Sequence, residues 1–343
     1  MALYLSENKE MCYNSFMTNY EKLSRLRNKK SVCLIGHIEP DADALSSMIV
    51  LREFLINHFK VENVDIFGDY NNLPSIYEEI LDGVQLNPEI KNYETAIMID
   101  SPNTDRLGKF ASLFNSANNK IVIDHHATNQ NCGEINIVEM CSSTCEIIYS
   151  ILQYFHYEIS KENQGKLYAG IITDTNNFTV GNYNKRTFEI AGACIENINK
   201  TQIFNAFLSS NSLRQMQLIA MAIQNLNSYQ NGQIIISKLS VEEISKYNAT
   251  SDDCSVVINK LATISGNKLV CFIYPSKDQF YVSMRAKDGY DVSKIATRNG
   301  GGGHKGAAAF LSNKPIEKIK LDIAKAFTNE LEKGTLPHTK LFK

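Results

Sequence analysis

Six side chains of the kind that ligate metal ions stand near the ends of strand-like runs, or in loops, in the first half of the chain. They are two imidazoles and four carboxylates: His37, Asp41, Asp43, Asp100, His125 and Asp174. Four carboxylates gathered without cations would raise one another's pKa values, whereas two divalent ions would offset their charge. Oxygen-rich ligands with some imidazole and no thiolate suit Mn²⁺ or Mg²⁺ better than structural Zn²⁺. Two such ions generate a nucleophilic hydroxide and hold a phosphoryl group for in-line displacement, so the set predicts phosphoester hydrolysis.

Taken singly, each carboxylate has a simpler interpretation. Asp43 precedes an apolar run with helical spacing and could be a helix N-cap, and Asp174 could simply end its segment. Caps and turns are the commoner use of such residues. Adjacent His125 and His126 at the end of an apolar run are harder to explain by packing. The whole set therefore favours a metal site.

Three apolar runs deliver these side chains. Residues 32–35 lead into His37, residues 96–99 lead into Asp100, and residues 121–123 lead into Asp124, His125 and His126. The carboxyl ends of strands in open α/β sheets are where ligands bind. Helical spacing between 44 and 59 alternates with these runs, which predicts an α/β domain with a largely parallel sheet.

The pattern restarts late in the chain. At 343 residues the chain exceeds the roughly 250–300 residues at which single cores usually split. From Gly232 onward, strand-like and helix-like segments alternate again, which predicts a smaller α/β domain across a cleft from the first. The expected boundaries are a catalytic domain over 1–195, a helical linker over 196–229 and a substrate-binding domain over 230–343.

Composition limits the partners. With 35 basic and 37 acidic residues the net charge is −2, which argues against broad electrostatic capture of long nucleic acid. Eight cysteines without a CxxC pair are expected to be mostly reduced core residues. No apolar run approaches the roughly 18 residues of a spanning helix, and charged residues occupy the start of the chain. We therefore expect a soluble cytoplasmic protein without a membrane partner.

Five stretches resemble, in order and spacing, the motifs of the DHH phosphoesterase superfamily. They are residues 36–44, 99–100 with 105–108, 123–129, 142–146 and 170–175. The resemblance implies one metal held by His37, Asp41 and Asp100, and a second held by Asp43, Asp100, His125 and Asp174, with Asp100 bridging. It also implies that His126 contacts the scissile phosphate. Asp124 would orient an imidazole, in line with the usual carboxylate–histidine pairing.

The chain departs from the usual motifs at a few positions. Ala42 and Ser46 stand where glycine is frequent, and Asn176-Asn177-Phe178 stands where Gly-x-Phe is expected. None of these changes removes a ligand. The last lies next to Asp174 and bears on substrate preference.

A glycine run marks the second domain. Its formal match to G-x-G-x-x-G does not follow a strand, so composition alone favours a flexible surface loop. Residues 284–287, 291–296 and 300–308, however, resemble the C-terminal domain of the oligoribonuclease and pAp-phosphatase branch of the superfamily. This resemblance implies a substrate-binding group that holds the far phosphate and terminal nucleotide: Arg285, Gly301, Gly302, Gly303, His304 and Lys305.

These observations lead to one expected function and two rivals. The expected protein is a two-metal phosphoesterase, with Mn²⁺ preferred and Mg²⁺ as the alternative, that degrades RNA a few nucleotides long to mononucleotides. Dephosphorylation of 3′-phosphoadenosine 5′-phosphate, a nucleoside 3′,5′-bisphosphate, to AMP is a second expected reaction. The first rival is a stand-alone phosphodiesterase for cyclic or linear dinucleotides, and the second is a regulator that has lost catalysis. The sequence leaves the oligomeric state open, a homodimer included.

Overall fold

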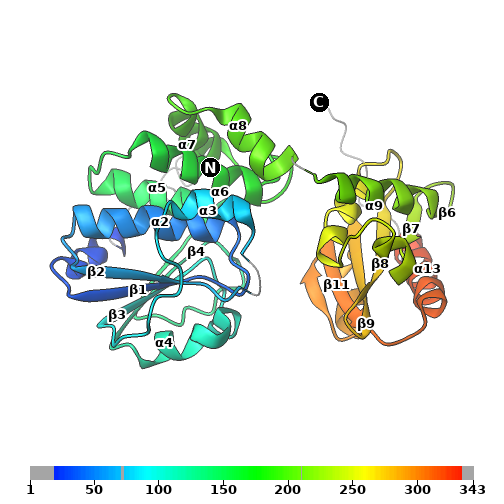
Figure 1. The fold of residues 1–343 in the computed structure, drawn as a ribbon, viewed down its shortest axis with the longest axis horizontal. Coiled ribbons are helices and arrows are strands. Elements are labelled where there is room, and N and C mark those ends of the chain that lie inside the picture. The colour runs from blue at the N-terminus through cyan, green and yellow to red at the C-terminus, as the bar shows by residue number, and fades with distance from the viewer. Residues whose placement is uncertain (1–18, 71–72, 210, 334–343) are drawn as a thin grey trace, which may run out of the picture. The chain divides into compact units, whose positions relative to one another are not determined.

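The computed structural model describes residues 19–70, 73–209 and 211–333 (Figure 1). Contacts within the chain divide it into two compact units, residues 1–210 and residues 211–343. Each unit has its own sheet and its own core, so each is described separately.

The first unit is built on a five-stranded sheet in the order β2-β1-β3-β4-β5, with every neighbouring pair parallel. Its strands are short and mostly buried, as expected for a parallel sheet covered on both faces. Their bounds are β1 (Ser31–Ile35), β2 (Asn63–Phe67), β3 (Thr95–Ile99), β4 (Asn119–Asp124) and β5 (Ile135–Val138).

Helices cover both faces of this sheet. Because side chains alternate along a strand, Val32 and Leu34 of β1 pack into one core, and Cys33 and Ile35 pack into the other. Figure 1 shows α2, α5 and α6 over the first face and α4 over the second. The helical segments of this unit are η1 (Lys22–Leu26), α2 (Ala42–Asn57), α3 (Ser75–Leu81), η2 (Thr104–Phe110), α4 (Ala111–Ser116), α5 (Thr144–Tyr154), α6 (Lys161–Asp174), α7 (Lys185–Ile195), α8 (Lys200–Phe204) and η3 (Asn205–Ser209).

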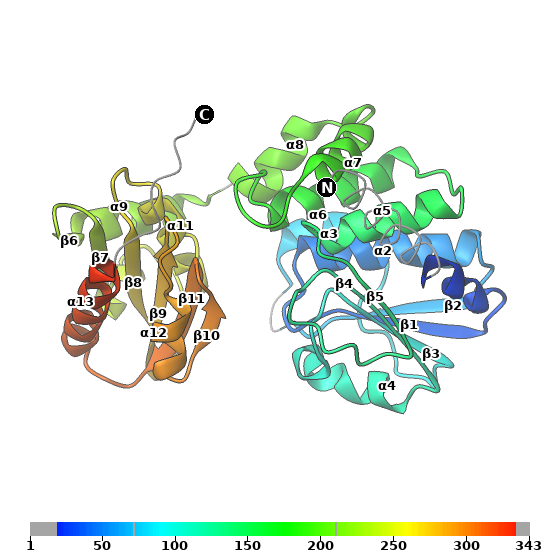
Figure 2. The same ribbon diagram turned by 180° about the vertical axis from the view of Figure 1, so that it is seen from behind.

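The second unit has a six-stranded sheet in the order β10-β11-β9-β8-β7-β6. Within it β7 and β8 are parallel, and the other neighbouring pairs are antiparallel. Helices α12 and α13 pack on one face, and α9, α10 and α11 pack on the other (Figure 2). The bounds are α9 (Leu213–Gln224), β6 (Asn227–Tyr229), β7 (Ile234–Lys238), α10 (Val241–Ser245), η4 (Asp252–Cys254), α11 (Val257–Ala262), β8 (Leu269–Ser276), β9 (Gln279–Ala286), α12 (Ser293–Arg298), β10 (Gly302–His304), β11 (Ala307–Ser312) and α13 (Ile316–Glu332).

The α/β fold predicted from the sequence is confirmed, with a parallel sheet in the N-terminal part and a separate, smaller sheet domain after it. The segment predicted as a linker, residues 196–229, is shared between the two units. Helix α8 packs against α6, whereas α9 buries Leu218, Ile219 and Ala222 in a core of the second unit.

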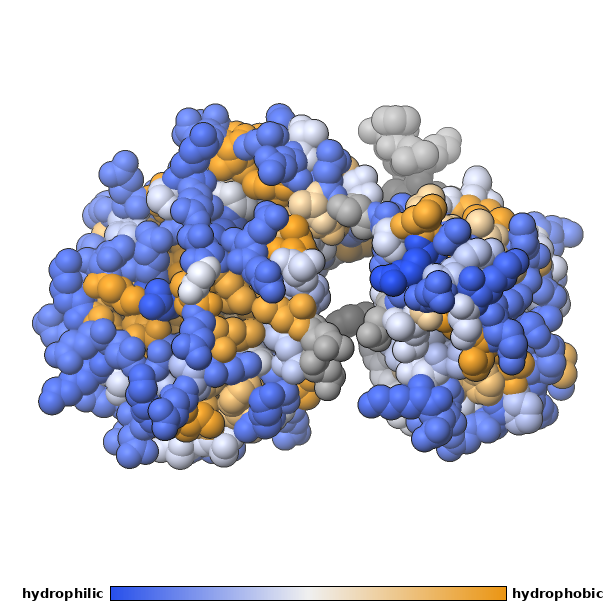
Figure 3. Space-filling view, viewed as in Figure 1, coloured by the Kyte–Doolittle hydropathy of each residue, from blue (hydrophilic) through white to orange (hydrophobic). Residues whose placement is uncertain are grey.

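The surface view in Figure 3 is mainly hydrophilic, with hydrophobic patches between the polar side chains. No helix within the described ranges has the length and hydrophobicity that a membrane span requires.

Candidate metal centre

The carboxyl edge of the parallel sheet gathers the predicted ligands. His37 follows β1, Asp100 follows β3, and His125 follows β4. Two helix ends complete the group, because Asp41 and Asp43 stand at the start of α2 and Asp174 ends α6. Potential ligand atoms lie within 4.8 Å of one another in three groups: His37, Asp41 and Asp100; Asp43, His125 and Asp174; and Asp100, His125 and His126.

Asp100 is at the middle of this cluster. Its Oδ2 lies 3.7 Å from His37 Nε2, and its Oδ1 lies 3.4 Å from His125 Nε2. Asp100 also has a positive φ of 55°, which is uncommon for a residue other than glycine and is found most often at functional sites. Since it belongs to two of the three groups, one carboxylate has the position that a bridging ligand needs.

The spacing of the ligand atoms fits cations rather than direct hydrogen bonds. His125 Nε2 lies 3.5 Å from Asp174 Oδ2, and His37 Nε2 lies 4.0 Å from Asp41 Oδ2. These separations exceed ordinary hydrogen-bond lengths. Two ligands that each lie about 2.1 Å from one ion stand roughly 3 to 4.2 Å apart, depending on the angle between them at the ion. The donor set, carboxylate oxygen with imidazole nitrogen, is one that Mn²⁺ accepts.

The start of α5 holds the carboxylates in place. Asp43 is fully buried, and its two oxygens accept hydrogen bonds from Thr144 N at 2.7 Å and Cys145 N at 2.9 Å. Thr144 Oγ1 donates to Asp100 Oδ1 at 2.8 Å. The N-cap of α2 is Asp41, which accepts from the backbone of Asp43 and Ala44. The alternative interpretation of Asp43 as the cap is therefore wrong, and its carboxylate faces the cluster.

Crowding changes the pKa values of these groups. Burial, followed by the charges of neighbouring carboxylates, raises the pKa of Asp43 and Asp100. Burial likewise raises the pKa of Asp174 to about 7. Burial opposes the charge on His125, but the carboxylates of Asp100 and Asp174 outweigh it and raise the pKa of that imidazole. The raised pKa values of the carboxylates show that burial and mutual repulsion both oppose their charge in this site. Bound cations would offset that repulsion.

Asp124 lies behind the cluster and fixes His126. It is fully buried, and its Oδ1 lies 2.7 Å from His126 Nδ1. Burial opposes ionisation of Asp124, but hydrogen bonds from His126 and Asn129 outweigh it and lower the pKa of this carboxyl. The bond to the carboxylate occupies Nδ1 of His126 and leaves Nε2 outside that contact.

Asn129 has a contact that the sequence reasoning did not assign. Its Nδ2 donates to Asp124 Oδ2 at 2.6 Å and to Ser101 O at 3.1 Å. It therefore ties the residue after Asp100 to the carboxylate that orients His126. The sequence could have indicated this role, because Asn129 is the last residue of the motif that begins at Ile123.

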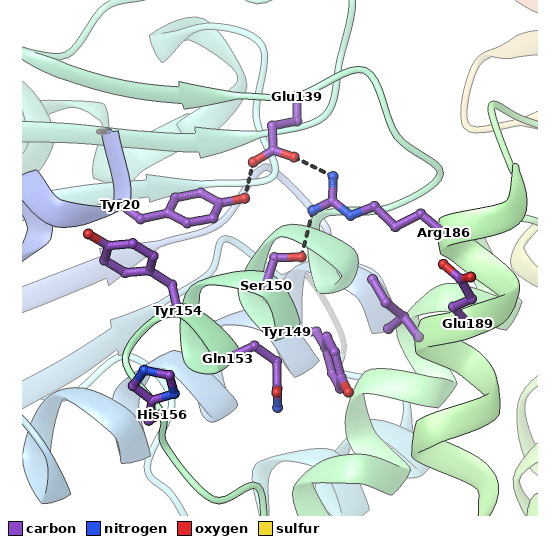
Figure 4. Close-up of a pocket in the computed structure, with 10 residues that line it drawn as sticks. Tyr20, Glu139, Tyr149, Ser150, Gln153, Tyr154, His156, Arg186 and Glu189 are labelled. Carbon is purple, nitrogen blue, oxygen red and sulfur yellow. Dashed lines mark hydrogen bonds and ion pairs between the residues drawn. The ribbon is translucent and has the colours of Figure 1, made fainter. Parts of the chain in front are cut away.

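A cavity of about 700 Å³ lies beside β5, α5 and α7. At one side Glu139 accepts hydrogen bonds from Tyr20 and from Arg186, whose Nη2 also bonds Ser150 (Figure 4). Glu139 is nearly fully buried, and its backbone N–H donates to Asp124 O at 3.1 Å. This network therefore joins the start of α7 to the end of β4.

In the second unit, Arg285 lies on β9 and the glycine run reaches into β10, two strands of the same sheet. Strand β11 separates them, pairing with β9 opposite Arg285 and with β10 opposite Gly302 and Gly303. Asn259 Oδ1 accepts hydrogen bonds from Nε and Nη2 of Arg285, at 3.2 and 3.1 Å. Among the ion pairs of the described residues none involves Arg285, so its charge is available to an anion.

The second half of the glycine run, Gly302 and Gly303, belongs to strand β10 rather than to a loose loop. A Cβ at Gly301 would lie 2.1 Å from Ala309 O, and one at Gly303 would lie 2.5 Å from Ala307 O. Close backbone pairing therefore requires glycine at both positions, and the interpretation as a flexible surface loop is wrong. Lys305 is exposed in the turn that follows, whereas the side chain of His304 lies outside what the structure describes.

Comparison with known proteins accounts for both units. The DHH family, N-terminal domain, matches residues 31–173, and the DHHA1 domain matches residues 231–333. A bifunctional oligoribonuclease and PAP phosphatase of Bacillus subtilis is 29% identical over 289 residues, or 80% of this chain and 87% of its own. A probable bifunctional oligoribonuclease and PAP phosphatase of Streptococcus mutans is 27% identical over 286 residues, or 82% of this chain and 89% of its own.

A solved structure shares the fold. The exopolyphosphatase-related protein from Bacteroides fragilis superposes with a TM-score of 0.78 at 22% identity, covering 93% of this chain and 96% of that one. With both family domains matched in order over most of the chain, the protein belongs to the DHH family and carries a DHHA1 domain after its DHH domain.

Proposed function

We propose that this protein is a metal-dependent phosphoesterase that hydrolyses RNA a few nucleotides long and also 3′-phosphoadenosine 5′-phosphate. The observation that carries the proposal is the position of Asp100, whose carboxylate lies within reach of His37 on one side and His125 on the other. The names of the Bacillus subtilis and Streptococcus mutans relatives, oligoribonuclease and PAP phosphatase, support the choice of substrates.

The proposed ligands form two sets that share Asp100. His37 and Asp41 belong to the first set, and Asp43, His125 and Asp174 belong to the second. Mn²⁺ is the proposed ion, with Mg²⁺ as the alternative. When bound, such a pair lowers the pKa of a water molecule and polarises phosphoryl oxygens.

The residues around the cluster have separate tasks in this proposal. His126 donates from Nε2 to a phosphoryl oxygen, because Asp124 holds Nδ1 and stabilises the charged imidazole. The backbone N–H groups at the start of α5 keep Asp43 aimed into the cluster. Both arrangements exist before substrate arrives, so little reorganisation is needed during the reaction.

In the second unit we propose a phosphate-binding group. Arg285 presents a charged guanidinium held by Asn259, and close backbone approach is open at Gly302, where a Cβ would meet nothing within 4 Å. Lys305 adds an exposed cation, and His304 belongs to the group by its place in the motif.

The cytoplasm is the proposed location. Cys33, Cys141 and Cys145 are buried thiols without disulfides, as is usual in reducing compartments.

The function is tested by Mn²⁺-dependent turnover, measured side by side on four substrates. These are a labelled RNA dinucleotide, a longer RNA, 3′-phosphoadenosine 5′-phosphate and a cyclic dinucleotide. Faster turnover of the linear dinucleotide and of the bisphosphate supports the proposal. Preference for the cyclic compound would instead identify a signalling phosphodiesterase, and no turnover with any metal would identify a binding protein.

A further inference from the structure

A segment rich in aromatic residues begins directly after the proposed ligand Asp174. Residues 175–188 contain three aromatic residues, four asparagines, one lysine and one arginine, but no acidic residue. Acidic residues flank the stretch directly, at Asp174 and Glu189. Aromatic rings interleaved with cations and amides are the composition of surfaces that bind single-stranded nucleic acid.

Three aromatic rings form a cluster at the surface, which we call the aromatic platform and define as Phe178, Tyr183 and Phe188. Phe178 packs partly against the core, whereas Tyr183 and Phe188 are exposed. Phe178 and Phe188 stack with ring centroids 4.9 Å apart and an interplanar angle of 29°. Tyr183 meets Phe188 edge to face at 6.0 Å. Phe188 keeps 52% of its surface exposed and Tyr183 keeps 39%. Exposed aromatic surface of this kind can pack against a further ring.

The backbone holds the platform next to the metal centre. Asn176, Asn177 and Phe178 all have positive φ values, of 44°, 56° and 60°. Asparagine tolerates this conformation, but for phenylalanine it is strained and calls for a functional reason. The N–H groups of Thr179 and Val180 both donate to Thr175 O, at 2.9 and 3.0 Å, which closes the turn immediately after Asp174.

The other end of the segment is also fixed to the centre. Arg186, in the first turn of α7, bonds Glu139 Oε2 at 2.7 Å. Glu139 in turn donates from its backbone to the carbonyl of Asp124. The segment that carries the platform is thus connected to Asp174 at one end and, through Arg186 and Glu139, to Asp124 at the other.

We infer that the aromatic platform is a subsite for a nucleobase of the substrate, on which the base next to the scissile phosphate stacks. The inference rests on the proposed function, since it names where that substrate binds. A single-stranded base suits the platform because it offers a free aromatic face. Lys185 suits the adjoining phosphate: its side chain is 90% exposed, and its ion pair with Glu189 lies at the surface, where such pairs are weak.

The test combines a change in the protein with a change in the ligand. The probe is a hydrolysis-resistant RNA dinucleotide with a methylene phosphonate linkage and 2-aminopurine as one base, together with its abasic analogue. Phe188→Ala is expected to weaken binding of the dinucleotide about tenfold and to abolish the fluorescence quenching caused by stacking. Binding of the abasic analogue should stay unchanged.

Four further variants sharpen the result. Phe188→Trp should restore quenching and affinity, whereas Phe188→Leu, which is apolar but not aromatic, should not. Ile90→Ala serves as the matched control, because Ile90 is also exposed, at 58%, in the same unit but outside the platform. Tyr183→Ala should weaken binding of the base-bearing dinucleotide as well, and thermal unfolding confirms that each variant is folded.

The outcomes separate this inference from the proposed function. Equal loss of affinity for both probes, or no loss for either, would overturn the platform even if the wild type hydrolyses RNA. Base-dependent quenching by a wild type that fails to hydrolyse RNA would overturn the function and leave the base subsite standing. If Phe188→Ala instead converts a dimer to a monomer in sedimentation without changing dinucleotide binding, the platform is an interface between two copies of this chain.

Discussion

Gly170 of α6 lies directly against Asp43 of α2. A Cβ added at Gly170 would stand 2.9 Å from Asp43 Oδ1 and 2.3 Å from Cys145 Sγ. The close contact of α6 with α2 and α5 therefore depends on a missing side chain, and the same contact presses the carboxylate of Asp43 against the start of α5. A packing position in a helix thus controls the place of a proposed metal ligand.

Gly170→Ala is expected to displace Asp43 and lower metal affinity about 10- to 100-fold, the usual effect of disturbing a ligand's support. Overpacking should also destabilise the protein by about 1–3 kcal/mol. The matched control is Gly165→Ala in the same helix, where the nearest side-chain atom would be 3.5 Å away in ordinary contact. Metal titration by calorimetry and thermal unfolding of both variants provide the comparison, and equal metal affinity would contradict the assignment of Asp43.

Asp100→Asn tests the shared ligand with little change of shape. Asparagine also tolerates the positive φ at this position, so the backbone should be kept. Because one carboxylate serves both ligand sets, the loss of activity should exceed about a hundredfold, more than a supporting residue costs. Metal content measured by mass spectrometry should fall with it. Asp105→Asn, which changes an exposed acid in the first turn of η2, should leave both unchanged. Retained turnover in Asp100→Asn would rule out the two-metal arrangement.

Much of the first site could be predicted from the sequence, because its ligands follow recognisable strands. A parallel sheet brings the carboxyl ends of β1, β3 and β4 to one edge, so His37, Asp100 and His125 had to meet once the strands were identified. The hydrogen bonds that hold these ligands in place could not be predicted from local sequence patterns. Asp43 and Thr144 are 101 positions apart, and nothing in either segment alone indicates that they bond.

The same limit applies to the glycine run and to the platform. Glycine-rich composition does not distinguish a loose loop from a strand that needs close pairing. The need for glycine becomes visible only in the structure, where Ala307 O and Ala309 O lie close to Gly303 and Gly301. The replacement of a usual glycine by Asn176 is explained by a positive φ of 44°, which asparagine tolerates. The stacking of Phe178 on Phe188, ten residues later, could not be foreseen from spacing.

Arg285→Ala is expected to raise KM for the RNA dinucleotide about tenfold or more with a smaller change in kcat, because a charged hydrogen bond to the substrate is lost. Asn259→Ala should raise KM by a smaller factor. The Nε and Nη2 groups of Arg285 then lose the oxygen that accepts their hydrogen bonds, but the guanidinium itself remains. Lys260→Ala is the control, because Lys260 is an exposed cation next to Asn259. If Lys260→Ala raised KM as much as Arg285→Ala, and Asn259→Ala left KM unchanged, charge alone rather than the held guanidinium would attract the substrate.

Metal removal should make the protein sensitive to pH in a defined direction. Without metal, the pKa of Asp174 is raised to about 7, and those of Asp43, Asp100 and His125 are raised as well. Each group then holds more protons folded than unfolded. The stability that Asp174 contributes is complete below its unfolded pKa of about 4 and is lost as pH rises through 7, and the other three groups act in the same direction. The melting temperature of the metal-free protein should therefore fall between pH 5 and pH 8.

Metal binding should reverse this trend, because the ion replaces the protons that the carboxylates hold. Below pH 7 the affinity for Mn²⁺ should fall about tenfold per pH unit for each proton displaced. The rise in melting temperature on adding Mn²⁺ should accordingly be larger at pH 8 than at pH 6. Calorimetric titrations in two buffers of different ionisation enthalpy would count the protons released. Binding without proton release at pH 6 would mean that Asp174 is already ionised there and that carboxylate crowding does not control metal binding.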